Sequence, residues 1–432
     1  MPEESQWSVW SEKMKNIDLK YIYDNKPHTE MNQYPIGIQR NTILQYIDFL
    51  EENNYKHYVK KLKKGHRSIT LKREDGTNID VLKNPIYPTN SKVGRQIAID
   101  KFKTEKHLKG ANLLTTNSAI YQMDDREEAK LNAFKDKELE KGIVIKPLNL
   151  SLGKGVFVNV TKENFDEHWN QCVKIMKKNG RTEEDGLILV QDFMDGFEVR
   201  ATILEGHLIS VVARVPAFVK GDGIKTIEEL IDEKNKARQA CGFLSKNLIK
   251  KSDAVKAFIG NEGYTFKSVP NKESYVLLLS VSNTSFGGEV VEITDSVSEE
   301  TRELALNSLA ALPDMSCGGI DIMIRDFEDT APRVIEINPF PVLGLTTYPT
   351  YGKPQNPFKY FIEAFYTKDK LIYNLPLNPH ERKTTKKLFG LFNYSSKKND
   401  LESLNSDLYI RNYFKYFERQ HEMLRRQYSN KV

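Results

Sequence analysis

Cysteine is scarce in this sequence, and long apolar runs are missing from it. The three cysteines, Cys172, Cys241 and Cys317, lie far apart without CxxC spacing or a nearby histidine. This arrangement favours buried reduced thiols over a zinc site. The longest core-like apolar stretch, YVLLLSV at residues 275–281, is far shorter than the roughly 20 residues that a membrane-spanning helix needs. We therefore expect a protein without a membrane partner.

The chain also lacks a strong excess of either charge. Lys and Arg number 64 and Asp and Glu number 59, a formal net charge of +5. Such a balance suits an anionic ligand such as a nucleotide better than nucleic acid, which usually needs a concentrated basic stripe. The N-terminus, MPEESQWSVW, carries acids where a signal peptide has basic residues and then an apolar run. We expect a cytoplasmic protein without a nucleic-acid partner.

A length of 432 residues exceeds one ordinary core and predicts two or three domains or lobes. Residues 1–93 are predicted to form a small N-terminal α/β lobe, with an amphipathic helix at 40–53 and a hairpin that turns at Asp75 and Gly76. Residues 94–375 form the main domain, in two lobes that meet near 196. Residues 376–432 form a basic tail and a helix.

The main domain mixes helices with antiparallel strands, which is typical of the α+β class. A helix is expected near 100–109, and further helices at 162–178, 227–238 and 299–312, the last behind the N-cap candidate Ser298. The predicted strands are 142–147, 155–160, 187–193, 198–205 and 208–216. The last two strands are expected to form a hairpin joined at Gly206 and His207.

The tail ends in a predicted amphipathic helix. Its apolar face is aromatic and mixed, and the other face carries Arg and Lys. Such a helix docks on its own body or on a second subunit, so a homodimer is one expectation. Binding to a membrane surface is less favoured, because the apolar face is not strongly hydrophobic. The residues of that face are Ile410, Tyr413, Phe414, Phe417, His421, Leu424 and Tyr428.

A lysine at a strand end precedes a glycine turn in IKPLNLSLGKGVFVNV, residues 145–160. Glycines let backbone N–H groups approach a phosphate, and Lys146 and Lys154 supply positive charge. The spacing matches neither GxxxxGK[ST] nor a helix-opening GxGxxG. An ordinary β-turn is the competing interpretation for this segment taken alone.

In LILVQDFMDGFEVR, residues 187–200, an apolar strand leads through a turn to Glu198 and Arg200 on one face of a new strand. The end of the first strand could contact an adenine edge, and a carboxylate can accept both hydroxyls of a ribose. An exposed ion pair at the start of a hairpin is the alternative.

The segment RVIEINPFPVLG, residues 333–344, places Glu336 and Asn338 on one face of a buried strand. If the strand of GGIDIMIRD pairs with it, Asp321 joins them, and three oxygen ligands point the same way. Magnesium fits such a set when substrate phosphates complete its coordination. A metal-free polar network is the alternative, but neighbouring buried carboxylates repel each other, which favours the metal.

These three sites, in this order, resemble the ATP-grasp superfamily over residues 94–351. The segments RVPAFVKGDGIKTIEELI and SVPNKESYVLLLSVSNTSFGGEVVEITD are similar to segments of the ATP-grasp modules of cyanophycin synthetase and of bifunctional glutathione synthetase. The resemblance implies an ATP-grasp fold, in which two α+β lobes grip ATP. It does not extend to the second module of either relative, so we expect neither polymerisation of aspartate and arginine nor glutathione synthesis.

The activity that the resemblance implies is an ATP- and Mg²⁺-dependent carboxylate–amine ligase. ATP phosphorylates a carboxylate, and an amine attacks the acyl phosphate to give an amide or peptide bond, ADP and phosphate. Amino acids or small peptides are the expected substrates. An ATP-grasp kinase that transfers the phosphoryl group to a hydroxyl is the first alternative, and a non-catalytic ATP-binding protein is the second.

The resemblance also assigns residues of this sequence to roles. For ATP it implies two phosphate-binding lysines, a glycine loop, an adenine-reading hinge and a ribose acid: Lys101 (with Lys103 as the alternative), Lys146, Ser151, Leu152, Gly153, Lys154, Gly155, Gln191, Asp192, Phe193 and Glu198. The implied magnesium ligands are Asp321, Glu336 and Asn338. The implied catalytic residues are Lys146, Arg214 and Asn283. The residues placed nearest the substrate are Arg200, Arg214, Asn283, Ser285 and Gly288.

Overall fold

The structure is a computed structural model that describes residues 14–38, 41–83, 90–135, 142–148, 150, 155–280, 282–373, 375–383 and 385. Four residues of the expected glycine loop, Ser151, Leu152, Gly153 and Lys154, lie outside the described residues, as does the expected C-terminal helix. Within the described part, no helix combines the length and the apolar character needed to cross a membrane. The three cysteines are buried and free.

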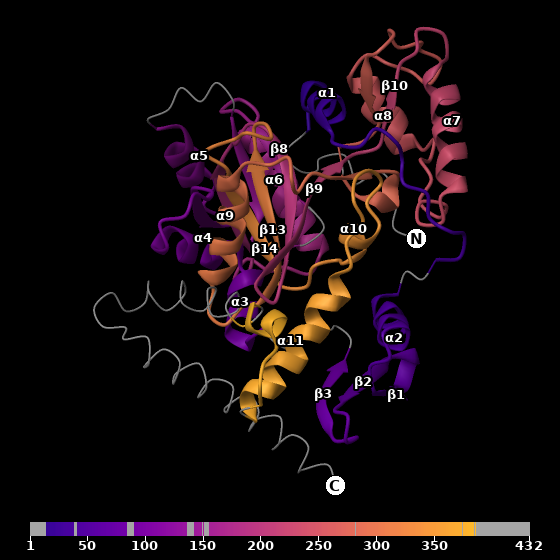
Figure 1. Ribbon diagram of the computed structural model, residues 1–432. Helices are drawn as coiled ribbons and strands as arrows, with labels where there is room; N and C mark the ends of the chain where they lie inside the picture. The colour runs from indigo at the N-terminus through magenta and orange to yellow at the C-terminus, as the bar shows by residue number, and fades with distance from the viewer. Residues whose placement is uncertain are drawn as a thin grey trace.

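A five-stranded antiparallel sheet forms the centre of the molecule, in the order β12-β9-β8-β13-β14. Helix α9 (Glu299–Ala310) covers one face of it (Figure 1). Ser298 is its N-cap, as expected, and the Ser298 side chain accepts from the Thr301 amide. Along β8, the inward residues Val199, Ala201 and Ile203 are fully buried in the main core. The strands are β8 (Phe197–Leu204), β9 (His207–Val215), β12 (Glu289–Glu292), β13 (Cys317–Ile324) and β14 (Arg333–Asn338).

The predicted hairpin between β8 and β9 is present, but its turn lies one residue earlier than expected. Leu204 pairs with His207, so the two loop residues are Glu205 and Gly206. Both have positive φ, +50° and +80°, as a two-residue turn between twisted strands requires. His207 was assigned to the turn, but it is the first residue of β9.

A four-stranded sheet, in the order β4-β7-β5-β6, forms the second lobe. Helix α6 (Phe165–Lys178) contributes Phe165, Trp169 and Cys172 to its core, and α5 (Arg126–Phe134) lies beside α6. The expected helix was to begin at 162. It begins three residues later, because Asn164 caps a preceding turn by accepting from the Thr161 amide at 2.8 Å. The strands are β4 (Ser118–Gln122), β5 (Ile143–Pro147), β6 (Phe157–Val160) and β7 (Leu187–Asp192).

The N-terminal region contributes to two different parts of the molecule. Helix α1 (Asn16–Asn25) buries Leu19 and Ile22 in the core of the central sheet. Helix α2 (Thr42–Glu52) and the sheet β1-β2-β3 pack instead beside α11 (Pro357–Ile372), where the Tyr46 and Phe358 rings are 4.6 Å apart (Figure 1). The predicted turn at Asp75 and Gly76 joins β2 (Arg67–Lys72) to β3 (Asn78–Lys83), and β1 is His57–Lys61.

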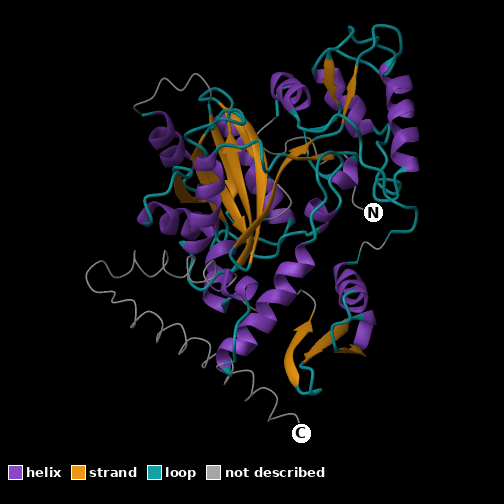
Figure 2. Ribbon diagram, viewed as in Figure 1, coloured by secondary structure: helices purple, strands orange, loops and turns teal. Residues whose placement is uncertain are grey.

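A smaller unit follows β9 and has its own core. Strands β10 (Phe218–Lys220) and β11 (Tyr275–Leu277) pair, and helices α7 (Ile227–Ala240) and α8 (Asp253–Asn261) pack on them (Figure 2). Helices α3 (Lys92–Ile99), α4 (Lys101–Gly110) and α10 (Gly344–Thr347) complete the regular elements of the main body. Antiparallel sheets with separate helices confirm the α+β class.

Candidate active site

The pairing of β13 with β14 brings two of the predicted carboxylates together. Asp321 lies directly opposite Glu336, and Gly319 lies opposite Asn338. Glu336 and Asn338 share a face of β14, whereas Ile337 turns into the core. Val334 also lies in the core, because the register with β13 shifts between Asp321 and Ile322. The Asp321 side chain is 3% exposed and that of Glu336 is 34% exposed. The carboxylate on β13 is therefore more deeply buried than the carboxylate on β14.

Arg200 neutralises Asp321 from the other side. It lies opposite Asp321 in the β8–β13 register, and its Nε donates to Oδ1 at 2.5 Å while Nη2 donates to Oδ2. Gly319 lies beside this side chain, and a Cβ there would lie 3.4 Å from Arg200 Cδ and 3.3 Å from Pro341 Cβ. The sequence placed Arg200 near a substrate carboxylate, and the structure pairs it with Asp321.

Arg214 and Glu198 extend the alternation of charges along the sheet. Nη1 of Arg214 donates to Oε1 of Glu198 at 2.8 Å and lies 3.9 Å from Oδ2 of Asp321. Both side chains are about one-fifth exposed, at 22% and 23%. Glu198, the expected ribose acid, is therefore held by Arg214 in this structure.

The two central carboxylates differ in their titration. Burial raises the pKa of Asp321, Arg200 opposes this, and the neighbouring charges of Glu198 and Glu336 add to it. Burial alone would also raise the pKa of Glu336, but the positive charges of Lys101, Arg200 and Lys146 outweigh burial and hold that pKa below its ordinary value. Glu336 is therefore ionised at neutral pH, as an oxygen ligand of a cation must be.

A pocket of about 420 Å³ opens beside Glu336 and Asn338. Lys101, the first residue of α4, reaches into it, and its Nζ lies 3.4 Å from Oε2 of Glu336. Asp100 separates α3 from α4 and caps α4 by accepting from the Phe102 and Lys103 amides, which fixes the direction of Lys101. The lining residues are Ala98, Ile99, Lys101, Leu148, Leu150, Arg181, Glu336, Ile337, Asn338 and Pro339.

Lys103, the alternative to Lys101, does not line this pocket. Its side chain is 64% exposed and its Nζ lies 3.3 Å from Asp100. The side chain of Lys101 is only 20% exposed. Both lysines lie on α4, which begins directly after the break at Asp100, but only Lys101 lines the pocket, a difference that the sequence could not show.

The strands of the second lobe contribute Lys146 on β5 and Gln191 on β7. Lys146 is buried, and its charge is close enough to lower the pKa of Glu336. Gln191 is 2% exposed, and its Nε2 has no hydrogen-bond partner among the residues that the structure describes. A buried donor without a partner is costly, so this amide is available to an acceptor on a ligand. Asp192 accepts from Asn117 Nδ2 at 3.3 Å, and Phe193 is half-buried.

Two glycines of the expected site lie within the described residues, Gly155 and Gly288. Gly155 has a φ of +75°, and a Cβ there would lie 2.9 Å from Pro147 Cγ, so the end of the glycine loop requires glycine. Gly288 is buried in front of β12. In the same loop, Asn283 Oδ1 accepts from the Ser285 amide at 3.0 Å, and Ser285 is exposed.

The oxygen donors fit a magnesium ion only with help from a ligand. Within the described ranges, no three Asp, Glu, His or Cys side chains gather closely enough to hold a metal. Asp321 is engaged by Arg200, and Asn338 Oδ1 accepts from the Phe340 amide at 2.9 Å. Magnesium usually takes one or two carboxylates and completes its octahedron with phosphate oxygens and water. The donor set fits that mode and no closed protein cage.

Arg181 is a pocket residue that the sequence analysis missed. It follows α6 in a polar segment that carries no motif, and it lies near the pocket because Leu187 accepts from the Leu148 amide at 2.9 Å. Its Nη1 is 3.3 Å from Asp185. No local sequence pattern marks Arg181 as a pocket residue, because its position depends on the antiparallel pairing of β5 with β7.

Removing one partner of the Arg200–Asp321 pair is expected to destabilise the central sheet strongly. Arg200→Met should lower the free energy of unfolding by about 3–5 kcal/mol, because the buried carboxylate loses its partner. Chemical denaturation measures the loss. The double variant Arg200→Met/Asp321→Leu removes both charges and should recover most of it. An equal loss of unfolding free energy in the single and the double variant would contradict the pairing.

Comparison with known proteins identifies the family of the chain. A family model for the ATP-grasp domain matches residues 98–342, and the chain belongs to that family. It is similar to the glutathione biosynthesis bifunctional protein GshAB of Clostridium perfringens, with 29% identity over 286 residues that cover 65% of this chain and 35% of that protein. It is also similar to the cyanophycin synthetase of Synechocystis sp., with 29% identity over 273 residues that cover 61% and 30% of the two chains.

A solved structure extends the likeness to the fold. The bifunctional glutathione synthetase from Pasteurella multocida gives a TM-score of 0.56 at 23% identity and covers 75% of this chain and 43% of that chain. These comparisons confirm the expected family and fold. The chain spans about a third of the length of the curated relatives that it matches.

Proposed function

We propose that this protein is an ATP-dependent carboxylate–amine ligase that forms an amide or peptide bond through an acyl phosphate. The observation that carries the proposal is the pocket in which Lys101 faces Glu336 and Asn338, with Asp321 directly behind them. A cation and two oxygen-bearing side chains that line one pocket, with a further carboxylate on the neighbouring strand, suit a bound polyphosphate with its magnesium. The family membership and the relatives, a glutathione synthetase and a cyanophycin synthetase by name, support the same chemistry.

ATP is the nucleotide of the proposal, and its adenine would meet Gln191, Asp192 and Phe193 at the end of β7. The unsatisfied Nε2 of Gln191 supports a polar ligand there. Glu198 would accept the ribose hydroxyls after releasing Arg214. The phosphates would extend towards Lys101 and Lys146, which neutralise their charge.

Glu336, Asn338 and Asp321 would hold magnesium together with the phosphates. The ion, when bound, neutralises charge that develops on the transferred phosphoryl group. Arg214, freed from Glu198, would contact the same group from the side of β9. The glycine loop at residues 151–155 would exclude water from the acyl phosphate. Asn283, Ser285 and Gly288 would lie on the side of the incoming substrates.

The acid and the amine are proposed to be amino acids or small peptides, in keeping with the names of the relatives. The expected domain boundaries at residues 93 and 375, the cytoplasmic location and the homodimer stay predictions, as does the expectation that neither nucleic acid nor a membrane is a partner.

The function is tested with purified protein, ATP and Mg²⁺ over a panel of amino acids and dipeptides in pairs. ADP and phosphate release are measured, and each mixture is analysed by mass spectrometry. The proposal predicts release that depends on two substrates and a product lighter than their sum by one water. ADP without free phosphate, together with a product heavier by one phosphoryl group, would assign the site to a kinase. No turnover with any pair, together with tight ATP binding, would favour a non-catalytic ATP-binding protein.

A further inference from the structure

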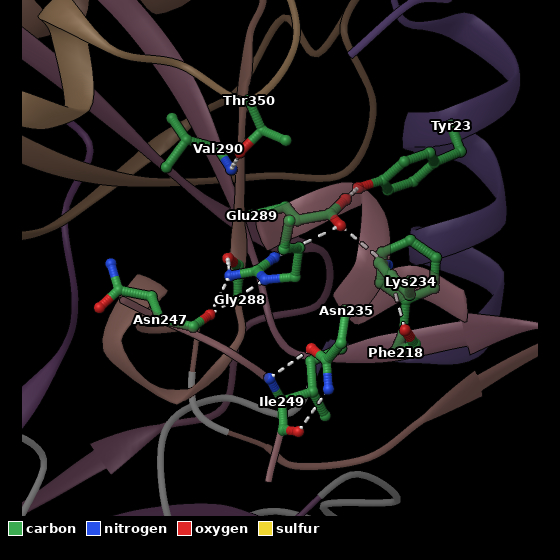
Figure 3. A network of polar contacts seen from close by, with 11 residues as sticks. Tyr23, Phe218, Lys234, Asn235, Asn247, Ile249, Gly288, Glu289, Val290 and Thr350 are labelled. Atoms are coloured by element: carbon green, nitrogen blue, oxygen red, sulfur yellow. Dashed lines mark hydrogen bonds and ion pairs between the residues drawn. The ribbon is translucent and has the colours of Figure 1, made fainter. Parts of the chain in front are cut away.

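A second cluster of charges, which shares no residue with the lining of the pocket, is buried at the start of β12. Its centre is Glu289, which is 1% exposed. The carboxylate accepts a hydrogen bond from the hydroxyl of Tyr23 on α1 and another from Nζ of Lys234 at 2.8 Å, and Nη1 of Arg238 lies 3.7 Å away (Figure 3). Lys234 and Arg238 are one turn apart on α7. Helices α1 and α7 therefore converge on one buried carboxylate of β12, which links three separate segments.

The carboxylate of this cluster faces two positive charges. Burial alone would raise the pKa of Glu289, but Lys234 and Arg238 outweigh it and hold that pKa below its ordinary value. Lys234 also donates to the Phe218 carbonyl at 3.1 Å and lies over the Phe218 ring, 3.2 Å from its centroid. A buried charge that loses such partners is strongly destabilising, so the three segments are held in one arrangement.

Arg238 connects this cluster to a loop. It is fully buried, and its guanidinium donates to the Asn247 carbonyl from Nε at 3.0 Å and from Nη2 at 2.7 Å. Nη2 also donates to the Gly288 carbonyl at 3.2 Å. Gly288 ends the loop at residues 282–288 that carries Asn283 and Ser285. One side chain of α7 thus ties the base of this loop to the neighbouring segment.

A second residue of α7 holds the surface on which the loop rests. Asn235 accepts from the Ile249 amide and donates to the Ile249 carbonyl, both at 2.9 Å (Figure 3). Ile249 packs tightly under Gly287, where a Cβ would lie 2.5 Å from Ile249 Cγ1. The loop is therefore fixed both through its backbone and through its packing.

The loop joins the sheet next to the candidate active site. In the β12–β9 register, Glu289 lies opposite Val215 and Val290 lies opposite Arg214. A Cβ at Gly288 would lie 2.8 Å from the Val215 carbonyl. A shift at the base of the loop would change its distance from the strand that carries Arg214.

We propose that Arg238 and Glu289 are positioning residues that hold the loop at residues 282–288 beside Arg214, and that they thereby set the affinity for the amino-acid or peptide substrate and not for ATP. This inference rests on the proposed function. Tyr23 adds a contact to Glu289 from α1, and this helix lies outside the residues matched by the family model. The ATP pocket, lined from α3, α4 and β14, contains none of these residues.

The first test follows hydrogen exchange of the loop and requires no substrate. The variant Arg238→Lys keeps the charge but loses the forked contacts with the Asn247 and Gly288 carbonyls. Amides of residues 282–288 should exchange about 10-fold faster, because the loop opens locally. The Kd for MgATP should stay unchanged. Exchange at the wild-type rate, or a Kd for MgATP raised about 10-fold, would overturn the inference.

The matched control is Lys368→Gln. Lys368 forms another buried ion pair, 2.6 Å from Glu205, which joins α11 to the β8–β9 turn and does not touch the loop. This variant should lose stability without a change in the exchange of residues 282–288. Tyr23→Phe removes one hydroxyl from Glu289 and gives a milder variant, with a smaller change in the same direction, should Arg238→Lys fail to fold.

The second test is kinetic and uses the pair of substrates that the panel identifies. Arg238→Lys should raise KM for the substrate that contacts the loop about 10-fold, with KM for ATP unchanged and kcat within about 3-fold, since misplacement weakens binding on that side of the site. Equal changes in both KM values, or a loss confined to kcat, would overturn the inference. If no pair gives turnover, the proposed function fails, and the exchange and MgATP measurements still decide whether Arg238 fixes the loop.

Discussion

Glu336→Gln is expected to lower kcat by about 10³-fold while the protein stays folded. The substitution keeps the shape of the side chain and removes the charge that lies 3.4 Å from Lys101 and opposite Asp321 on the neighbouring strand. A neutral amide is a poor ligand for magnesium beside a polyphosphate. Steady-state ADP release measures the effect, and circular dichroism and thermal unfolding report the fold.

Glu328→Gln is the control for this variant. Glu328 is exposed and lies between β13 and β14, in the loop that joins the two strands of the site. It should behave like the wild type in both measurements. A turnover of Glu336→Gln within about 3-fold of the wild type would show that Glu336 does not hold the ion, since loss of a charge that stabilises the transition state costs far more.

Lys101→Gln is expected to reduce kcat/KM for ATP by roughly 30- to 150-fold, because a hydrogen bond to a charged group contributes about 2–3 kcal/mol. Lys101 lines the pocket from the first position of α4. Lys103→Gln is the matched control two residues along the same helix, where the side chain is 64% exposed and pairs with Asp100. Its kcat/KM should stay within about 2-fold of the wild type.

One outcome of this comparison would contradict the assignment of Lys101. A larger loss in Lys103→Gln than in Lys101→Gln would reverse the assignment of the first phosphate-binding lysine. Titration with ATP in the absence of the other substrates separates binding from turnover. In that assay Lys101→Gln should weaken binding, while Lys103→Gln leaves it unchanged.

Local periodicity was enough to predict the strands of the site. The alternation in residues 333–338 put Glu336 and Asn338 on one face, and the apolar strand around Asp321 was its natural partner, which the β13–β14 register bears out. The hairpin at Asp75 and Gly76 was predictable for the same reason, because its turn residues are specific. Motifs carried on a single element or on adjacent elements were therefore within reach of the sequence.

Contacts between distant segments were not predictable. Arg200 and Asp321 are separated by 121 positions, and their pairing depends on β8 lying beside β13. The choice between Lys101 and Lys103 depends on the break at Asp100, and the position of Arg181 depends on the pairing of β5 with β7. No helix was predicted before residue 40, and helix α1 places Leu19 and Ile22 in the central core. Long-range register and packing, which no local pattern encodes, decide each of these.

The most direct test of the account is the fate of the carboxylate oxygen. The acid substrate that the panel identifies is labelled with ¹⁸O at both oxygens of its carboxylate, and the phosphate released in turnover is analysed by mass spectrometry. Activation as an acyl phosphate transfers one carboxylate oxygen to the phosphate when the amine displaces it. The account therefore predicts one ¹⁸O atom in each phosphate formed. Unlabelled phosphate, released at the same rate as the amide product, would contradict it.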